Sequence, residues 1–213
     1  MHENGYETGT NNRLLSDGVY NYDYDNEGNL ISKTEIATGN SQEFIWDYRN
    51  RLIAVIDKDN EGNELQRVEF VYDAFNRRIS KTVDTTPSDE VAGVVTHFVY
   101  NADDVHLEFV DNDGITGENE PILSQRYLHG AGVDQVLAQE DGNGNVIWML
   151  TDHLGTIRDL VDENGTLVNH LTYDSFGQVI AETDPSVETR YLFTGREFDE
   201  ETGLYYYRAL ISD

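Results

Sequence analysis

The fold is decided by a short stretch that recurs along the chain, Asp47-Tyr48-Arg49-Asn50-Arg51-Leu52. Phe44 and Trp46 alternate just before it, and an aliphatic run from Leu52 to Ile56 follows. An aspartate at the first position of a turn can accept hydrogen bonds from the backbone amides ahead of it. Three residues later the chain must pass through positive φ, which glycine and asparagine tolerate best. The stretch therefore predicts a type I turn with a left-handed residue, a common connection in β-hairpins.

The same spacing, an aspartate followed three residues later by glycine or asparagine, recurs at other places in the chain. We assign a structural role in turns to these pairs: Asp25 and Gly28, Asp47 and Asn50, Asp73 and Asn76, Asp152 and Gly155, Asp174 and Gly177. The period is 22 residues from position 25 to 47 and again from 152 to 174. Looser units lie between them, among them Phe98–Asn101 and Arg126–Gly130.

Each unit has the length of one hairpin, which is too small to bury its aromatic face alone. Neighbouring hairpins must therefore pair edge to edge, so we predict an all-β fold of successive antiparallel hairpins in one long curled sheet. Thr85–Val95 and Asp111–Pro121 are irregular and are expected to project as loops. Only Leu14–Ser16 and the last residues before Asp213 are compatible with a local helix.

Composition narrows the classes of function. The formal charge is −27, from 41 acidic and 14 basic residues, and such a surface repels phosphate backbones and anionic lipid. We therefore expect neither nucleic-acid binding nor membrane insertion. There is no cysteine, which excludes disulfides and thiolate metal sites. Met1–Gly5 lacks the pattern of a signal peptide, so export is expected to need a larger parent chain or a secretion machine.

In the second half of the chain, six ordered blocks resemble the core of the Rhs (rearrangement hotspot) family, and the aromatic-aspartate turns resemble its YD repeats. The blocks are Arg126–Gly130, Val133–Ala138, Thr151–Leu160, Tyr173–Gly177, Phe193–Asp199 and Thr202–Ala209. The resemblance extends from about Asn11 to Ala209. It implies a single domain over residues 1–213, with YD repeats over about 11–110 and the Rhs-associated core over about 122–209.

This resemblance implies a structural part of a polymorphic toxin or cell-surface protein. In the Rhs family, which is related to teneurins, the repeats form a hollow β-shell around a toxic C-terminal domain, and the core closes one end. The expected fold is then an open segment of a β-shell. The expected partners are the remainder of the shell and a toxin cargo. Secretion or surface display, by type VI secretion or another route, is the implied location.

The sequence departs from the family pattern after Ala209. Family members continue toward an Asp-Pro-x-Gly motif, at which some cleave themselves, and then a toxin. Here the chain reads Leu210-Ile211-Ser212-Asp213 and ends, and its one Asp-Pro pair, Asp184-Pro185, lacks the glycine. We therefore interpret the chain as a truncated shell segment or as one piece of a split gene.

The sequence gives little support for a catalytic or metal-binding site. His153 follows Asp152 inside a turn unit, which explains both residues without catalysis. The acidic stretches Asp23–Gly28 and Asp57–Gly62 begin like calcium-binding loops. Their twelfth positions, however, hold Thr34 and Val68 rather than glutamate. We predict no catalytic, cofactor-binding or metal-binding residue, with a looser surface calcium site as the alternative.

Three functional classes remain in view. The first is a non-catalytic β-shell segment, and the second is an extracellular module whose exposed tyrosines bind glycans or another partner. The third is an enzyme for self-cleavage or hydrolysis. Two further expectations concern contacts: Arg158 and Asp159 should form an inter-strand or inter-unit ion pair, and exposed strand edges should allow self-association.

Overall fold

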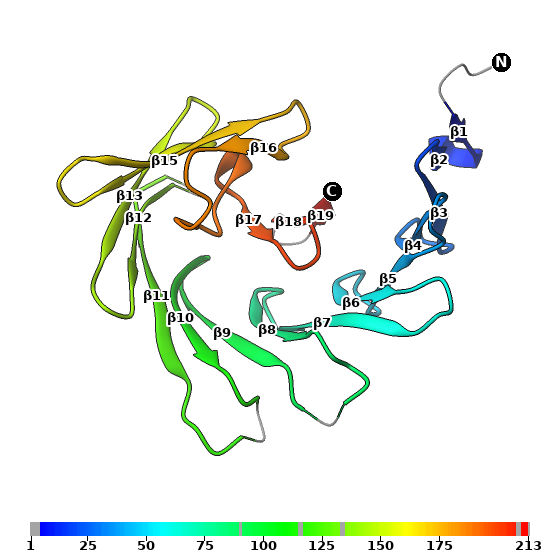
Figure 1. Ribbon diagram of the computed structural model, residues 1–213, viewed down its shortest axis with the longest axis horizontal. Coiled ribbons are helices and arrows are strands. Elements are labelled where there is room, and N and C mark those ends of the chain that lie inside the picture. The colour runs from blue at the N-terminus through cyan, green and yellow to red at the C-terminus, as the bar shows by residue number, and fades with distance from the viewer. Residues whose placement is uncertain (1–4, 90, 115–116, 133–134, 208–209, 213) are drawn as a thin grey trace.

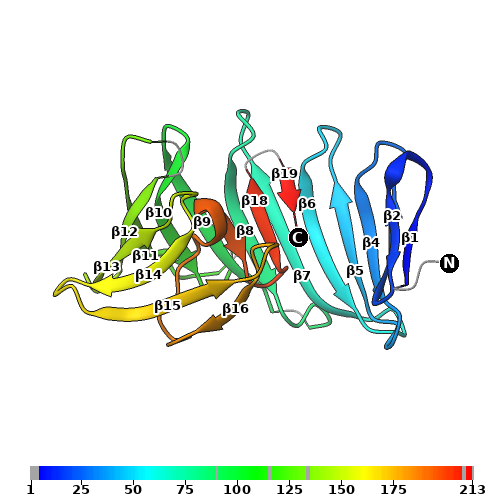
Figure 2. The same cartoon turned by 90° about the horizontal axis from the view of Figure 1, so that it is seen from above.

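The protein is an all-β chain, as the turn pattern predicts. The computed structural model describes residues 5–89, 91–114, 117–132, 135–207 and 210–212. Sixteen strands form one antiparallel sheet in which the order in space equals the order in sequence. The sheet bends into an open arc, and a second sheet of three strands lies inside this arc (Figures 1 and 2).

The first half of the large sheet comprises β1 (Tyr6–Thr8), β2 (Leu14–Asp17), β3 (Tyr20–Tyr24), β4 (Leu30–Glu35), β5 (Ser41–Trp46), β6 (Leu52–Lys58), β7 (Glu64–Tyr72) and β8 (Arg78–Asp84). The second half comprises β9 (Val94–Asn101), β10 (Asp104–Asp111), β11 (Ile122–His129), β12 (Val136–Asp141), β13 (Val146–Thr151), β14 (Ile157–Asp162), β15 (Leu167–Tyr173) and β16 (Val179–Glu182). The inner sheet comprises β17 (Glu197–Asp199), β18 (Leu204–Tyr207) and β19 (Leu210–Ser212).

Two segments that the sequence left open to helix are strands. Leu14–Ser16 lies in β2, and the last described residues form β19. The described helices are two short 3-10 turns, η1 (Thr10–Asn12) and η2 (Phe193–Gly195). Pairing with a neighbouring strand satisfies the backbone groups of these segments. A few consecutive residues taken alone do not reveal that pairing. Neither helix has the length or apolar character needed to cross a membrane.

The two irregular stretches join strands, but they are shorter than predicted. Val94 and Val95 already belong to β9, and Asp111 still belongs to β10, so the connections run over 85–93 and 112–121. Within them, Glu90, Ile115 and Thr116 lie outside the described residues.

The curl of the sheet has a local cause at the turns. Tyr72 pairs with Arg78 while Val71 pairs with Ser80, so one extra residue is inserted where β8 begins. The same shift occurs beside the turns that follow β3, β5, β13 and β15. Bulges of this kind increase the right-handed twist of a strand pair. Register shifts also occur at the opposite end of the sheet, between β6 and β7 and between β14 and β15, so bulges at both ends add to the twist of the curved wall.

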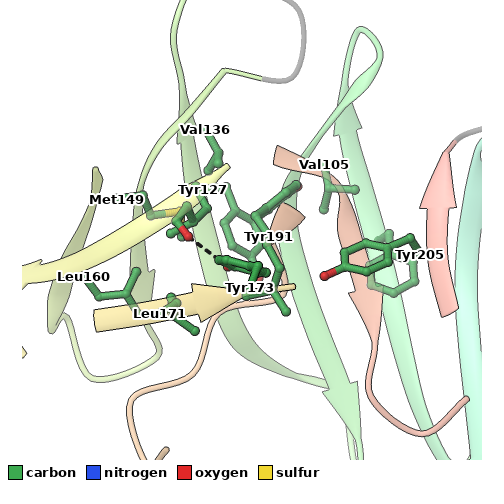
Figure 3. Packing of buried hydrophobic residues seen from close by; sticks show 12 residues of the cluster. Val105, Tyr127, Val136, Met149, Leu160, Leu171, Tyr173, Tyr191 and Tyr205 are labelled. Atoms are coloured by element: carbon green, nitrogen blue, oxygen red, sulfur yellow. Dashed lines mark hydrogen bonds between the residues drawn. The ribbon is translucent and has the colours of Figure 1, made fainter. Parts of the chain in front are cut away.

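The core lies between the concave face of this wall and the segment that returns inside it. We call residues 184–207 the inner strap. A large apolar cluster joins wall residues to Tyr191, Leu192 and Tyr205 of the strap (Figure 3). A smaller cluster on β5, β6 and β7 packs against Leu204 of the strap.

Candidate functional site

The predicted turn residues occupy one repeated geometry. In the turn between β7 and β8, Asp73 Oδ1 accepts hydrogen bonds from the backbone N–H groups of Phe75 at 2.8 Å and Arg77 at 2.9 Å. Asn76 has a φ of 66°. The other four third positions have φ values of 99° at Gly28, 58° at Asn50, 82° at Gly155 and 92° at Gly177. Asparagine therefore serves as well as glycine at this step because it tolerates the left-handed region.

Four of these turn aspartates, Asp25, Asp47, Asp73 and Asp152, have a carboxyl pKa below the usual value. The side-chain amide of Asn29 and several backbone N–H groups donate to Asp25, and they keep the pKa of its carboxyl below the usual value. At Asp47, partial desolvation opposes ionisation, but hydrogen bonds from Arg51 outweigh it and the pKa is again lowered. A carboxylate that accepts several hydrogen bonds is stabilised in its charged state.

Three further turns with the same geometry join strands at the opposite end of the sheet. They are Asp59–Asn63, Asp141–Asn145 and Asp162–Thr166, with positive φ at Gly62, Gly144 and Gly165. The five turn pairs assigned from the sequence do not include these three turns. The same spacing from aspartate to glycine would have revealed them.

In most units an aromatic residue at the end of the strand before the turn links neighbouring hairpins, whereas Thr151 holds this place before Asp152. The Tyr72 hydroxyl donates to the carbonyl oxygen of Leu52, where β6 begins, at 2.7 Å. The equivalent bonds run from Tyr24 to Leu14, Trp46 to Leu30, Tyr100 to Arg78 and Tyr173 to Ile157. Each ring thus packs on the concave face while its polar atom finds a backbone acceptor.

Arginines fix one turn to the next. Arg51 pairs with Asp47 of its own turn at 2.6 Å, donates to the carbonyl oxygen of Asp73 in the following turn, and lies over the Tyr72 ring at 5.0 Å. Arg77 repeats this pattern with Asp73, Ala102 and Tyr100. The turns therefore form a connected row along one end of the wall.

The inner strap is tied to this row. The Tyr206 hydroxyl donates to the carbonyl oxygen of Asn76 at 3.2 Å, and the Tyr205 hydroxyl donates to that of Gly177 at 2.7 Å. A Cβ atom at Gly177 would come within 2.6 Å of the Phe193 ring. Glycine is thus required at position 177 both by positive φ and by the close approach of the strap.

A buried ionic network joins the strap to β8. Arg78 is 0% exposed, and its guanidinium pairs with Asp199 and, at 3.1 Å, with Glu197. The same guanidinium lies over the rings of Phe70 at 5.0 Å and Tyr206 at 4.4 Å. Burial alone would raise the pKa of Asp199, but the charges of Arg78 and Lys81 outweigh it and hold that pKa low.

The network continues to β10 through a second buried arginine. Arg190 of the strap pairs with Glu108 on the wall and shares Glu197 with Arg78, at an N–O distance of 2.8 Å. The Tyr127 hydroxyl donates to Glu108 at 3.0 Å, and burial raises the pKa of this tyrosine well above its usual value. Charges from three places in the chain are thereby paired inside the arc.

The strap fills only part of the concave face. Toward β3–β6 a hollow of about 930 Å³ remains open, lined among others by Tyr22, Phe44, Trp46 and Lys33, with Leu204 of the strap at its border. Aromatic and polar side chains of the wall therefore still face an open interior there.

The acidic stretches considered for calcium have other partners. Asp57 accepts from the side-chain amides of Gln42 at 2.9 Å and Gln66 at 3.3 Å, and its burial raises the pKa of its carboxyl. The same glutamines donate to the carbonyl oxygens of Thr202 and Glu201 in the strap. In the described part of the chain, no three His, Asp or Glu side chains are grouped so as to hold a metal ion.

Asp152 and His153, which are adjacent in the sequence, do not form a catalytic charge relay. His153 is exposed, while Asp152 accepts from the turn amides and from Arg158 Nε at 3.2 Å. Asp159 contacts His170 on the neighbouring strand at 2.6 Å. Arg158 and Asp159 thus have separate partners, one within the hairpin and one across strands.

The blocks that resemble the Rhs core occupy the turns of β11–β16 and most of the strap. Phe193–Asp199 forms η2 and β17, and Thr202–Tyr207 leads into and forms β18. Val133, Asp134, Arg208 and Ala209, which belong to two of these blocks, lie outside the described residues.

A curved wall of repeated aromatic-aspartate hairpins with a strap across its concave face defines a β-shell protein. The family model described as Teneurin YD-shell matches residues 3–209. The chain therefore belongs to the Teneurin YD-shell family, and the predicted relationship to Rhs and YD-repeat proteins is confirmed. It is a structural segment of such a shell.

Similar proteins come from several bacteria. The chain is 26% identical over 200 residues to tRNA3(Ser)-specific nuclease WapA of Bacillus spizizenii, covering 93% of this chain and 8% of that protein. It is 29% identical over 221 residues to double-stranded DNA deaminase toxin A of Burkholderia cenocepacia, covering 95% and 15%. It is 29% identical over 209 residues to toxin protein Tse5 of Pseudomonas aeruginosa, covering 88% and 15%. The chain thus spans a small fraction of each relative.

Solved structures share the fold. The crystal structure titled TcdB2-TccC3 matches with a TM-score of 0.60 and 18% identity, covering 100% of this chain and 13% of that one. A second, titled TcdB2-TccC3-Cdc42, matches with a TM-score of 0.60 and 19% identity, over 95% and 12%. Both confirm an open antiparallel sheet of the shell type.

Proposed function

We propose that this chain is a non-catalytic wall segment of a shell that encloses the C-terminal cargo of a polymorphic toxin. The observation that carries the proposal is the attachment of the inner strap to the concave wall by the network of Arg78, Asp199, Glu197, Arg190 and Glu108. Connected ion pairs inside the arc specify one arrangement of strap and wall, because any other arrangement leaves a charge unpaired.

The relatives support a wall that is independent of the cargo. Two of them are named as a nuclease and a deaminase, and the chain covers only 8% and 15% of their lengths. The same wall sequence thus accompanies differently named activities. We infer that the chemistry of such proteins lies outside the segment that this chain represents, and that this chain performs no reaction.

The proposal includes its organisation and setting. Residues 1–213 are taken as one domain, with YD repeats over about 11–110 and the Rhs-associated core, including the strap, over about 122–209. The proposed partners are the remainder of a shell and its cargo, without nucleic acid or membrane insertion. Secretion as part of a larger toxin, by the type VI route or another, is the proposed location.

Two measurements on the purified chain test the proposal. Incubation with tRNA and with double-stranded DNA should give no product beyond a buffer control, and the intact mass of the chain should stay constant. Limited proteolysis should leave the strap uncut while the connection between β8 and β9 is cleaved first, because loops unfold locally at low cost. Turnover of a nucleic acid, or cleavage first in the strap, would refute the wall assignment.

A further inference from the structure

Besides the ion pairs, amide side chains of the wall hold the inner strap by its backbone. Gln66 Nε2 on β7 donates to the carbonyl oxygen of Glu201 at 2.7 Å. Gln42 Nε2 on β5 donates to the carbonyl oxygen of Thr202 at 3.3 Å. Every residue of any sequence carries a backbone carbonyl, so neither bond depends on the side chains of the strap.

The same kind of contact recurs near the beginning of the strap. Gln139 Nε2 on β12 donates to the carbonyl oxygen of Glu188 at 2.7 Å. Asn169 Nδ2 on β15 donates to the carbonyl oxygen of Val187 at 3.1 Å, and Asn169 Oδ1 accepts from the backbone N–H of Asp184 at 3.0 Å. The concave face therefore binds a polypeptide at several points through groups that all sequences share.

The open hollow of the concave face begins where the strap turns back. The strap reverses at Gly203, where φ is 70°, one residue after the carbonyl that Gln42 binds. Gln42, Gly203 and Leu204 all line the hollow of about 930 Å³. The hollow extends over the four strands β3–β6, or roughly 14 Å, which is the length of about four residues of extended chain. It is thus continuous with the part of the face that already holds a polypeptide.

The hollow offers both apolar and hydrogen-bonding groups. Tyr20 and Trp46 line it with half-buried rings, on which apolar side chains can pack. The exposed amides of Asn40 and Gln178 also line it. Within the residues that the structure describes, neither of these side-chain amides has a hydrogen-bond partner. They are therefore available to backbone N–H and C=O groups, as Asn169 is to those of the strap.

The charges of the hollow favour an uncharged occupant. Its lining includes Lys33, Arg49 and Lys58 together with Glu35 and Asp57, so positive and negative groups nearly balance there. The chain as a whole carries −27. A strongly charged ligand of either sign would meet like charges in the hollow, whereas a neutral peptide backbone has dipoles that both signs can contact.

We propose that the hollow binds an extended polypeptide segment through its backbone, largely independently of the sequence of that segment. The inference rests on the proposed function and names the partner at this site, a stretch of the cargo. The strap shows the mode of binding on the adjoining surface. Recognition of the backbone also suits a wall whose relatives carry differently named activities.

The fluorescence of Trp46 can report occupancy of the hollow. The chain has two tryptophans, and Trp148→Phe, on the opposite face of the sheet from the buried Met149, leaves Trp46 alone. The probes are two unrelated blocked peptides, acetyl-Ser-Val-Thr-Leu-Ser-Val-Thr-amide and acetyl-Gln-Ala-Ser-Ile-Gln-Leu-Ser-amide, and the neutral sugar maltoheptaose. Both peptides should change the emission of Trp46 to saturation, with dissociation constants within about 3-fold of each other. Maltoheptaose should leave the emission unchanged.

A pair of variants in the same background tests the amides. Asn40→Leu combined with Gln178→Leu removes two amides of the hollow and should weaken the binding of both peptides by at least ~5-fold. Both positions are exposed, so the variant should fold. Asn21→Leu is the matched control, because Asn21 is exposed on the opposite face of β3 from Tyr22, and it should change neither affinity.

Four results would overturn the proposal: no response of Trp46 to either peptide, binding of one peptide only, binding of maltoheptaose in place of the peptides, or equal affinities for the double variant and the control. The wall assignment is judged separately, by the resistance of the strap to proteolysis. A resistant strap together with any of these four results would reject the hollow as a polypeptide site and leave the wall assignment standing.

Discussion

Arg78 and Asp199 are 121 residues apart in the sequence and form a fully buried ion pair between the wall and the inner strap. Arg78 stands at the start of β8, directly after a predicted turn, and Asp199 ends β17. The pair is therefore one of the contacts that hold the inner strap against the repeating wall.

Removing one partner of this pair should be costly. Asp199→Ala leaves the Arg78 guanidinium buried with only Glu197 beside it, and breaking a buried pair costs about 3–5 kcal/mol. We expect a loss of that order in the free energy of unfolding, measured in urea, together with early proteolytic cleavage of the strap. Glu200→Ala, at the exposed neighbouring position, is the control and should change stability little. Equal stability of the two variants would show that the pair does not fasten the strap.

The Arg78–Asp199 pair also predicts that the attachment of the strap weakens in acid. The pKa of Asp199 is lower in the folded chain than in the unfolded chain, so the unfolded state takes up its proton first as pH falls. Its stabilising contribution is full above the unfolded pKa of about 4 and disappears as pH falls through the lower folded value. Unfolding midpoints measured from about pH 6 to pH 2 should therefore fall more steeply for the natural chain than for Asp199→Asn. Parallel profiles would rule out Asp199 as a source of the acid sensitivity.

The wall was predictable from sequence because its rules are local. An aspartate and the residue three places later determine each turn, and alternation determines which side chains face inward. The strap was not predictable, because Arg78, Glu197 and Asp199 show no sequence pattern that indicates a contact between residues so far apart in the chain. The strand at Leu14–Ser16 was not predicted for a related reason, because its pairing with β3 depends on the whole sheet and not on these residues alone.

Positive φ at the turns predicts a graded response to substitution at Gly62. An added Cβ there meets no atom within 4 Å, so any cost arises from the backbone alone. Gly62→Val should lower the free energy of unfolding by about 1–3 kcal/mol, because a β-branched residue is strained at φ of 87°. Gly62→Asn should cost much less, since Asn50 and Asn76 occupy the same position with positive φ in this chain. Thermal unfolding of both variants measures the difference, and equal losses would count against left-handed geometry as the requirement.

The hydroxyl of Tyr72 predicts how firmly adjacent hairpins are joined. It is the donor to Leu52 O, and burial raises its pKa, so it stays protonated and keeps donating through the alkaline range in which an exposed tyrosine ionises. Tyr72→Phe retains the ring but leaves that carbonyl without the bond, which should cost about 1 kcal/mol in the free energy of unfolding. Tyr48→Phe removes a hydroxyl from an exposed ring and serves as the matched control, with no change expected. Urea unfolding compares the two, and hydrogen exchange at the start of β6 should quicken only in the Tyr72 variant. If both variants unfold alike, the aromatic residues before the turns contribute packing alone, and the hairpins are joined by their backbone hydrogen bonds.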